Sequence, residues 1–320
     1  MMFKGVDFFP HGTKMPVMEW RRVCISISWI AAMIAIALLF TKGHNLNVDF
    51  KGGSLFEIRK TDGDIDVGAL RSKLNDLGLG GIQIQGLDKS NEALVRFGEQ
   101  DGGEEAQKAA TQKVTEALGS GIEIRRSEVV GPAVSGELKR AGLIAVICAI
   151  LGIMIYVWFR FEWQFGVAAI LALVHDIIIT AGMFSLLNYE FGLTEVAALL
   201  TLAGYSINDT VVVFDRIREN LRKYKKMPLI ELMNLSINET LSRTVLTATT
   251  TFIAVLALYI LGTEVIKGFS FAMLFGILIG TWSSIFVASP FLLWIGIKRE
   301  TIGGVRDLEA PKGKPTVAKA

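Results

Sequence analysis

The sequence predicts an α-helical polytopic membrane protein with six transmembrane helices and one inserted α+β domain. Hydrophobic residues make up 51% of the 320 residues and only 20% are charged. The hydrophobic residues are gathered in long runs, and a run of roughly 18 or more is long enough to cross about 30 Å of hydrocarbon as a helix. Residues 41–140 lack such runs and alternate between strand and helix patterns instead.

Six segments have the length and apolarity of membrane-spanning helices: 23–40, 141–159, 165–187, 196–214, 244–262 and 268–296. Pro290 in the last segment is expected to mark a kink or the frayed end of that helix. The first segment could alternatively be a cleaved signal peptide. No small-x-small cleavage site follows it, so a retained anchor is favoured.

The distribution of charge predicts the orientation of these helices. Residues 188–195 (NYEFGLTE) carry two Glu and no Lys or Arg, whereas residues 215–226 (DRIRENLRKYKK) carry six Lys or Arg. Cytoplasmic loops of membrane proteins are enriched in Lys and Arg. We therefore expect the leader 1–22 and the basic tail 297–320 to be cytoplasmic.

The loop 215–243 is expected on the same cytoplasmic side, and part of it has the pattern of an amphipathic helix. Pro228 stands where a helix would begin. The residues that follow form an apolar face suited to the membrane interface: Leu229, Met233, Ile237 and Leu241.

The inserted domain, 41–140, has the element order β-α-β-β-α-β, which is typical of a split βαβ, ferredoxin-like sandwich. The strand patterns are 54–60, 81–87, 92–99 and 121–131, and the helix patterns are 67–80 and 104–121. The acidic turn TDGDIDVG (61–68) lacks the closing Glu of a calcium loop. No catalytic cluster stands out, so we expect no enzyme activity, no metal, no cofactor and no nucleic-acid partner.

Charged residues inside spans usually face a protein interior or a water path. Asp209 lies five residues before the end of its span, about 8–10 Å inside the boundary at 1.5 Å per residue. Arg243 opens the next span at a similar depth, and a cytoplasmic hairpin joins the two spans. An Asp209–Arg243 pair is therefore reasonable, either as a proton site or as a static ion pair that fixes helix packing.

Other polar residues inside the spans have two interpretations each. Asp176 could lock helices by accepting hydrogen bonds or could act in function. His175 faces about 100° away from it on an ideal helix, so we expect that the two residues do not form one site and that His175 could simply be a packed, hydrogen-bonded residue. Thr247 is expected to bond back to its own helix, with a polar water path as the alternative, and Asn208 is a candidate supporting residue for Asp209. Two glycines in the sixth span have the small-xxx-small spacing of a packing face: Gly276 and Gly280.

Five segments in this order resemble the SecF family of the bacterial SecD–SecF protein-export complex, within the resistance-nodulation-division superfamily. They are NVDFKGGS (47–54), VVGPAVSGEL (129–138), VHD (174–176), GYSINDTVVVFDRIREN (204–220) and TLSRTVLTATTT (240–251).

The resemblance implies a multi-pass subunit of the bacterial inner membrane whose domain 41–140 is periplasmic. It implies SecD, the SecYEG translocon and translocating preproteins as partners, with YajC as a further candidate. It also implies use of the proton gradient, with Asp209 and Arg243 in proton conduction. Two alternatives remain: a proton-driven small-molecule exporter of the same superfamily, and a passive assembly subunit without proton chemistry.

Overall fold

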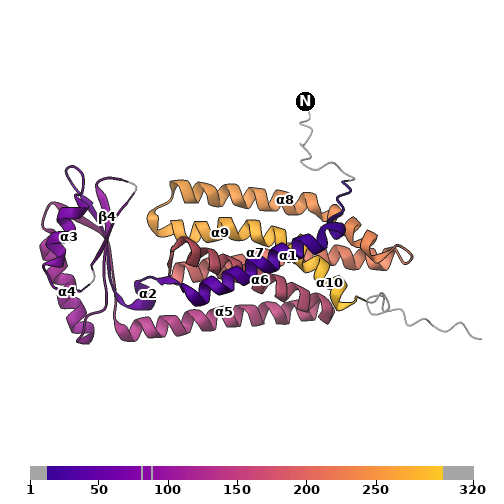
Figure 1. Cartoon of the computed structure of the whole chain (residues 1–320), viewed down its shortest axis with the longest axis horizontal. Helices are drawn as coiled ribbons and strands as arrows, with labels where there is room; N and C mark the ends of the chain where they lie inside the picture. Colours follow the sequence, from indigo (N-terminus) through magenta and orange to yellow (C-terminus); the bar gives the residue numbers. More distant parts are fainter. Residues whose placement is uncertain (1–12, 81, 88, 298–320) are drawn as a thin grey trace, which may run out of the picture.

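The computed structural model of the chain describes residues 13–80, 82–87 and 89–297, and within them six helices are long and apolar enough to cross a membrane. The prediction of six transmembrane helices is confirmed at this level of length and composition. The helices lie side by side as one bundle with a small α+β unit at one end (Figure 1). They are α1 (Val17–Thr41), α5 (Pro132–Arg160), α6 (Trp163–Leu187), α7 (Leu193–Lys223), α8 (Leu229–Leu261) and the interrupted sixth helix, which comprises α9 (Glu264–Ser283), the π-helical turn η1 (Ser284–Ala288) and α10 (Ser289–Ile295).

The bundle has inner and outer helices. The apolar windows of α6, α7 and α9–α10 are 56%, 50% and 56% buried, whereas those of α5 and α8 are 11% and 6% buried. About half of the residues in the apolar windows of the inner helices are therefore buried within the protein. Most residues in the apolar windows of α5 and α8 are not buried, and their side chains can contact lipid or a partner protein.

The predicted cytoplasmic loop 215–243 is mostly helix, because α7 continues to Lys223 and α8 begins at Leu229. As predicted, a helix begins directly after Pro228, but it continues without a break into the fifth span as α8. Met233 and Ile237 of its apolar face are 0% and 1% exposed and belong to the largest core cluster of the bundle. The position of this helix at the membrane interface stays a prediction.

The sixth helix is interrupted just before Pro290, where the sequence predicts a kink or a frayed end. A π-helical turn precedes the proline, and the helix then continues to Ile295. Proline has no N–H and clashes with the preceding turn, and a π-turn widens that turn. The Ser289 hydroxyl donates to the Ser284 carbonyl at 2.9 Å, which satisfies a backbone acceptor at the interruption.

The α+β unit contains one antiparallel sheet of four strands in the spatial order β3-β4-β2-β5. Helices α3 and α4 lie on one face of this sheet (Figure 1), and the core between them includes Phe56, Val95 and Val114. The elements in chain order are β2 (Gly53–Lys60), α3 (Val67–Asn75), β3 (Gln83–Gly86), β4 (Glu92–Phe97), α4 (Gly103–Leu118) and β5 (Ile122–Val130).

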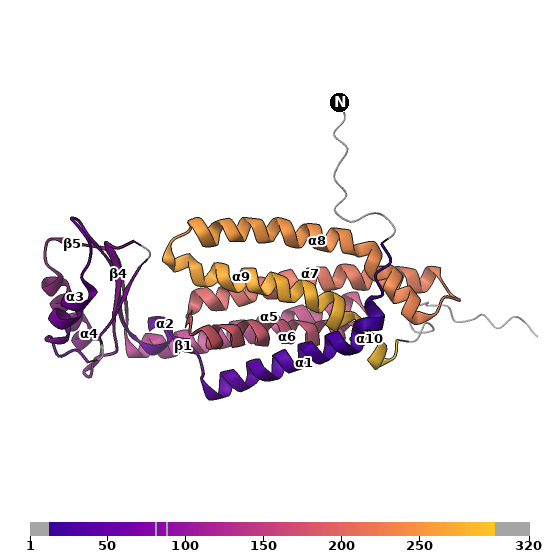
Figure 2. The ribbon, with the colours of Figure 1, turned by 45° about the horizontal axis from the view of Figure 1, so that its top comes forward.

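A second, two-stranded sheet joins the α+β unit to the bundle. Strand β1 (Asn45–Leu46) follows α1 and pairs in parallel with β6 (Glu190–Phe191), which lies between α6 and α7. The short helix α2 (Val48–Lys51) then leads into β2. Figures 1 and 2 show that α1 begins and α10 ends at the opposite end of the bundle.

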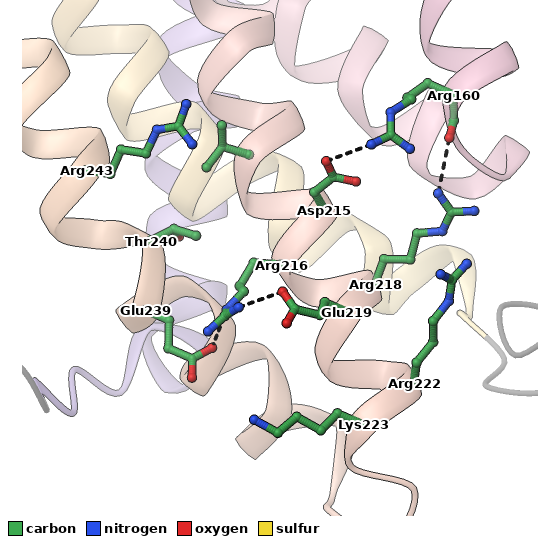
Figure 3. A pocket seen from close by; sticks show the side chains of 11 residues that line it. Arg160, Asp215, Arg216, Arg218, Glu219, Arg222, Lys223, Glu239, Thr240 and Arg243 are labelled. Atoms are coloured by element: carbon green, nitrogen blue, oxygen red, sulfur yellow. Dashed lines mark hydrogen bonds and ion pairs between the residues drawn. The ribbon is translucent and has the colours of Figure 1, made fainter.

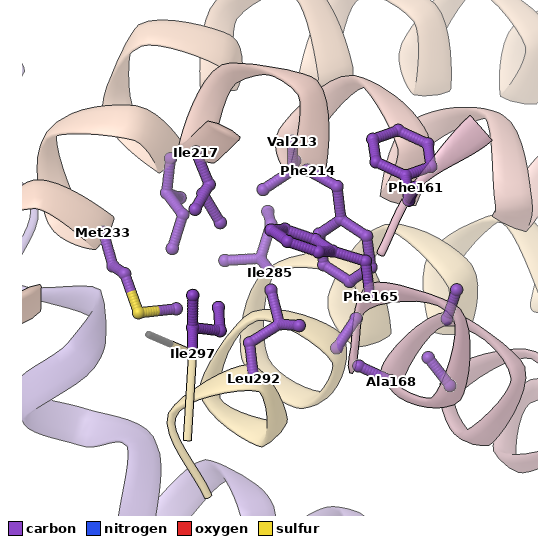
Figure 4. Packing of buried hydrophobic residues seen from close by; sticks show 14 of the residues in the cluster. Phe161, Phe165, Ala168, Val213, Phe214, Ile217, Met233, Ile285, Leu292 and Ile297 are labelled. Atoms are coloured by element: carbon purple, nitrogen blue, oxygen red, sulfur yellow. The ribbon is translucent and has the colours of Figure 1, made fainter. Parts of the chain in front are cut away.

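That opposite end holds the main hydrophobic core of the bundle (Figure 4). Phe165 of α6 and Phe214 of α7 meet edge to face with ring centroids 5.2 Å apart, and Phe161 joins them from the α5–α6 turn. Phe165 and Phe214 are both 0% exposed. Since aromatic rings in this geometry add to the energy of area burial, this core fixes the ends of α6 and α7 against each other.

Gly182 gives a direct test of the packing between α1 and α6. A Cβ at Gly182 would lie 2.4 Å from the Ala35 Cβ and 2.7 Å from its Cα, whereas a Cβ at Gly152 of α5 would meet nothing within 4 Å. Gly182→Ala should therefore lower the free energy of unfolding by about 1–3 kcal/mol. Gly152→Ala should leave it unchanged or raise it by up to about 1 kcal/mol. Thermal unfolding in detergent micelles measures both, and equal stability of the two variants would contradict this packing.

Candidate functional site

Asp176 of α6 is the point at which three inner helices are joined by hydrogen bonds. Its side chain is 0% exposed. Ser206 Oγ of α7 donates to Asp176 Oδ2 at 2.5 Å, and Ser283 Oγ of α9 donates to the same oxygen at 2.7 Å. An ionised carboxylate is an acceptor with room for several donors. Of the two interpretations that the sequence left open, these contacts fit an acceptor that locks helices together.

His175 contacts Asp176 directly, which corrects the expectation that the two residues are not one site. His175 Nδ1 lies 2.9 Å from Asp176 Oδ1, and His175 Nε2 is buried without a hydrogen-bond partner among the described residues. An ideal helix separates neighbouring Cβ directions by about 100°. Rotation of both side chains about their own bonds brings the ring nitrogen and the carboxylate together despite that angle.

The sequence prediction missed Ser206 and Ser283, although a signal for Ser283 was present. A Cβ at Gly276 would lie 2.4 Å from the Leu202 side chain, and one at Gly280 would lie 3.2 Å from Ser206 Cβ. These glycines therefore let α9 approach α7 closely, as the small-xxx-small spacing predicts. Ser283 continues the same stripe of small residues one turn further along α9, where its hydroxyl reaches Asp176.

Asp209 lies near the middle of α7, three residues beyond Ser206 and therefore about one turn along the helix. The residue is 3% exposed. Its Oδ2 atom has no hydrogen-bond partner within residues 13–80, 82–87 and 89–297. A buried carboxylate oxygen without a partner is costly, and this cost sets Asp209 apart from Asp176, whose oxygens have partners.

Arg243 of α8 is exposed and lies near enough for its charge to act on Asp209, but the structure shows no hydrogen bond from it to Asp209 Oδ2. Thr247 donates to the Arg243 carbonyl at 2.8 Å, the back-bond expected of a threonine in a helix. Asn208 is exposed, on a different side of α7 from the buried Asp209. The structure therefore brings Asp209 and Arg243 into one neighbourhood, and the supporting role of Asn208 stays a prediction.

A cavity of about 740 Å³ opens at the ends of α5, α7 and α8 (Figure 3). Val212, which lines it, is one helical turn from Asp209, so the cavity begins close to that buried carboxylate. Arg243 also lines it. Six cationic and three anionic side chains contribute to the wall, and the full lining is Arg160, Val212, Asp215, Arg216, Arg218, Glu219, Arg222, Lys223, Glu239, Thr240 and Arg243.

The other end of α7 is held by the segment that enters the α+β unit. Asp49 Oδ2 accepts hydrogen bonds from the Leu193 N–H at 3.0 Å and from Asn47 Nδ2 at 3.1 Å. Glu195 Oε2 accepts from the Gly192 N–H at 2.7 Å. A Cβ at Gly192 would lie 2.1 Å from Asn47 Nδ2, so only glycine allows this approach. The helix that carries Ser206 and Asp209 is thus attached to the α+β unit.

Two further contacts join the α+β unit to the bundle at β6. Arg96 of β4 forms an ion pair with Glu190. The His44 ring stacks on Phe191, with ring centroids 4.4 Å apart and an interplanar angle of 23°. Burial lowers the pKa of the His44 imidazole below its ordinary value of 6.5, so the neutral ring is the form that this contact favours.

Among the described residues no three His, Cys, Asp or Glu side chains gather as a metal site would require. Two buried carboxylates of the bundle differ in their surroundings. Asp176 accepts hydrogen bonds from two other helices. Asp209 has one oxygen, Oδ2, without a hydrogen-bond partner among the described residues, and it lies next to a basic cavity.

Comparison with known proteins places this arrangement in a family. Residues 110–298 match the family model described as protein export membrane protein SecD/SecF, C-terminal. The protein translocase subunit SecF of Cereibacter sphaeroides is 47% identical over 299 residues, which cover 91% of this chain and 92% of that protein.

This chain spans about two fifths of the length of some longer relatives. The protein translocase subunit SecDF of Brucella abortus is 42% identical over 302 residues, which cover 94% of this chain and 40% of that protein. The crystal structure of SecDF from Thermus thermophilus, a translocon-associated membrane protein, superposes with a TM-score of 0.78 at 38% identity. That match covers 90% of this chain and 39% of the Thermus chain.

The lock at Asp176 predicts unequal effects of two neighbouring serine substitutions. Ser283→Ala removes a donor to Asp176 and should lower the free energy of unfolding by about 0.6–2 kcal/mol. Ser284→Ala is the control, because the Ser284 hydroxyl donates within its own helix to the Thr281 carbonyl. The free energies of unfolding of the two variants are compared by thermal unfolding in lipid nanodiscs. A loss from Ser284→Ala as large as that from Ser283→Ala would rule out the lock.

The contact of His44 predicts a dependence of stability on pH. Because the folded state lowers the His44 pKa, the unfolded chain binds more protons between the folded and unfolded pKa values, and stability falls as the pH drops below about 6.5. His44→Phe keeps a ring against Phe191 but cannot titrate. Hydrogen exchange of residues 44–52 is measured at pH 7.5 and pH 5.5 and corrected for the intrinsic pH dependence of amide exchange. The protection of these residues should fall more at pH 5.5 in the wild type than in the variant. An equal loss of protection in both would show that His44 is not responsible.

Proposed function

The chain belongs to the SecD/SecF family of protein-export membrane proteins, as a SecF-type subunit, and from this membership we propose that it acts in preprotein translocation driven by the proton gradient. In this proposal the Asp209 carboxylate gains and loses the proton. The positive charge of Arg243 attracts this carboxylate when it is ionised. The chemistry is transport, without an enzymatic step.

The single observation that carries the proposal is the state of Asp209. It is buried on an inner helix, it has an oxygen without a hydrogen-bond partner among the described residues, and it lies one turn from a basic cavity. A permanently ionised group would be expected to have partners, whereas a group that gains and loses a proton needs access to water. Movement of one charge across the membrane is worth ~2.3 kcal/mol per 100 mV.

The attachment of the first turn of α7 to the segment that enters the α+β unit supports a route from protonation to movement. Loss of the negative charge at Asp209 would remove its attraction to Arg243 and allow α7 to shift against α8. Asp49 holds the first N–H of α7, and Arg96 holds Glu190 just before that helix. A shift of α7 would therefore act on the α+β unit, where work on a preprotein would be done.

The proposed partner is a SecD-type subunit. The chain spans 40% of the SecDF protein of Brucella abortus, and parallel-repeat transporters are often built from two such halves. The outer helices α5 and α8 offer large apolar surfaces for the other half. SecYEG, preproteins and YajC belong to the same proposal as further partners.

We further propose that the α+β unit is ferredoxin-like and periplasmic, and that both termini are cytoplasmic in the bacterial inner membrane. The β-α-β-β-α-β order and the antiparallel sheet support the first assignment. The basic residues around the cavity, at the end of the bundle opposite the α+β unit, support the second because cytoplasmic ends are enriched in Lys and Arg.

Export of a slow-folding periplasmic protein in cells tests the role of Asp209. Asp209→Asn and Arg243→Met should each lower the export rate by roughly tenfold or more, because the ~2.3 kcal/mol per charge per 100 mV no longer contributes. Thr201→Val on the exposed side of α7 is the control and should export at the wild-type rate.

Each variant must still co-purify with its SecD-type partner, so that loss of assembly is not mistaken for loss of proton transfer. Wild-type export by an assembled Asp209→Asn variant would favour the passive assembly subunit. The charge exchange of Asp209→Arg with Arg243→Asp separates packing from proton chemistry. Assembly without export is the expected result of that exchange.

A further inference from the structure

The cavity at the ends of α5, α7 and α8 has more positive charge than its own carboxylates neutralise. Arg160 pairs with Asp215 at 3.0 Å. Arg216 uses both remaining acids of the lining, Glu219 at 2.6 Å and Glu239 at 2.7 Å. All three carboxylates of the wall are therefore engaged by two of its six cations.

The surplus charge lies mainly along α7. Arg222 and Lys223 form no ion pair with any described residue that the structure records, and Arg218 pairs at 3.3 Å with Glu162, which is outside the cavity wall. The Arg218 Nε atom is buried without a hydrogen-bond partner among the described residues. Figure 3 shows the guanidinium groups of Arg218 and Arg222 along the same side of α7, near the end of α5.

Like charges four residues apart on a helix destabilise it, so these arginines favour an anion between them. The guanidinium group presents a planar fork of donors that matches phosphate oxygens in two parallel hydrogen bonds. The oxygens of a phosphate group could accept two parallel hydrogen bonds from the Arg222 guanidinium. The positive charge of Arg218, which already donates to the Arg160 carbonyl and pairs with Glu162, would attract the same phosphate.

The surroundings of the cavity place it at the depth of lipid headgroups. Just before Arg160, the α5 side chains Tyr156, Trp158 and Phe159 are 57%, 68% and 90% exposed. Tyr and Trp are enriched at the membrane–water interface. On the α8 side, Leu246 is 53% exposed. It lies three residues after Arg243, which is less than one helical turn further toward the α+β end of the bundle. Apolar surface for acyl chains thus continues from both sides of the cavity toward the membrane core.

From this combination we propose that the cavity binds the phosphate group of an anionic phospholipid, with the acyl chains lying along the exposed faces of α5 and α8. Basic pockets between transmembrane helices on the cytoplasmic side are suited to such headgroups. A soluble phosphate shares the headgroup chemistry but makes no use of the apolar faces. This inference rests on the orientation given in the proposed function, and Arg243 lines the same cavity. The residues that would hold the phosphate, Arg218 and Arg222, are not assigned to proton transfer at Asp209.

Native mass spectrometry of the full chain in non-ionic detergent tests this site. The probes are phosphatidylglycerol and phosphatidylcholine with the same acyl chains. Phosphatidylglycerol should bind at least roughly tenfold more tightly, because the choline of phosphatidylcholine would bring a second positive charge up to the unpaired cations of the cavity, whereas the glycerol headgroup is neutral. Arg222→Gln should weaken phosphatidylglycerol binding by roughly tenfold, and Arg218→Gln combined with Arg222→Gln should weaken it further.

Lys226→Gln is the matched control, since it removes one positive charge from the α7–α8 turn without changing the cavity wall. It should weaken phosphatidylglycerol binding by less than about twofold, because an exposed charge outside the cavity wall is screened by solvent and salt. Equal losses from Lys226→Gln and Arg222→Gln would overturn the site in favour of diffuse attraction. Equal binding of the two lipids, or displacement of phosphatidylglycerol by millimolar inorganic phosphate, would overturn the assignment to an anionic lipid.

Discussion

The carboxylate of Asp176 is the constraint on which the arrangement of the inner helices depends. Helices in a bilayer gain little hydrophobic free energy from meeting each other, so close packing and polar contacts must hold them. A buried carboxylate also requires donors, and here they come from α7 and α9. The glycine stripe of α9 provides the close approach, and Asp176 fixes the register at which the three helices meet.

Helix α7 connects the hydrogen bonds at Asp176 to Asp209, to the α+β unit and to the main hydrophobic core. Its first N–H is held by Asp49, Ser206 binds Asp176, and Asp209 follows one turn later. Beyond Asp209, Phe214 packs in the main core, and Asn220 binds Ser236 of α8 at 3.0 Å. A change of charge at Asp209 therefore acts on a helix whose neighbours on both sides are firmly placed.

Much of the candidate site was predictable because charge within an apolar run is conspicuous. Asp176, Asp209 and Arg243 stood out in this way, and Asp209 and Arg243 do lie in one neighbourhood. The serines did not stand out, because a hydroxyl in a helix usually bonds to its own backbone. Whether it instead reaches a carboxylate depends on how closely the next helix approaches. The contact of His175 with Asp176 depends on side-chain rotation, which helical spacing does not describe.

The six spans, the inserted strand and helix pattern, and the charged residues at the helix ends could all be predicted from the sequence. These features are local, because hydrophobic runs and periodicity act over one element at a time. Tertiary packing was needed to show that the start of α8 lies in the core, that Asp176 is shared by three helices, and that Asp209 Oδ2 has no hydrogen-bond partner among the described residues. Such outcomes depend on distances between segments far apart in the chain, and no single segment contains that information.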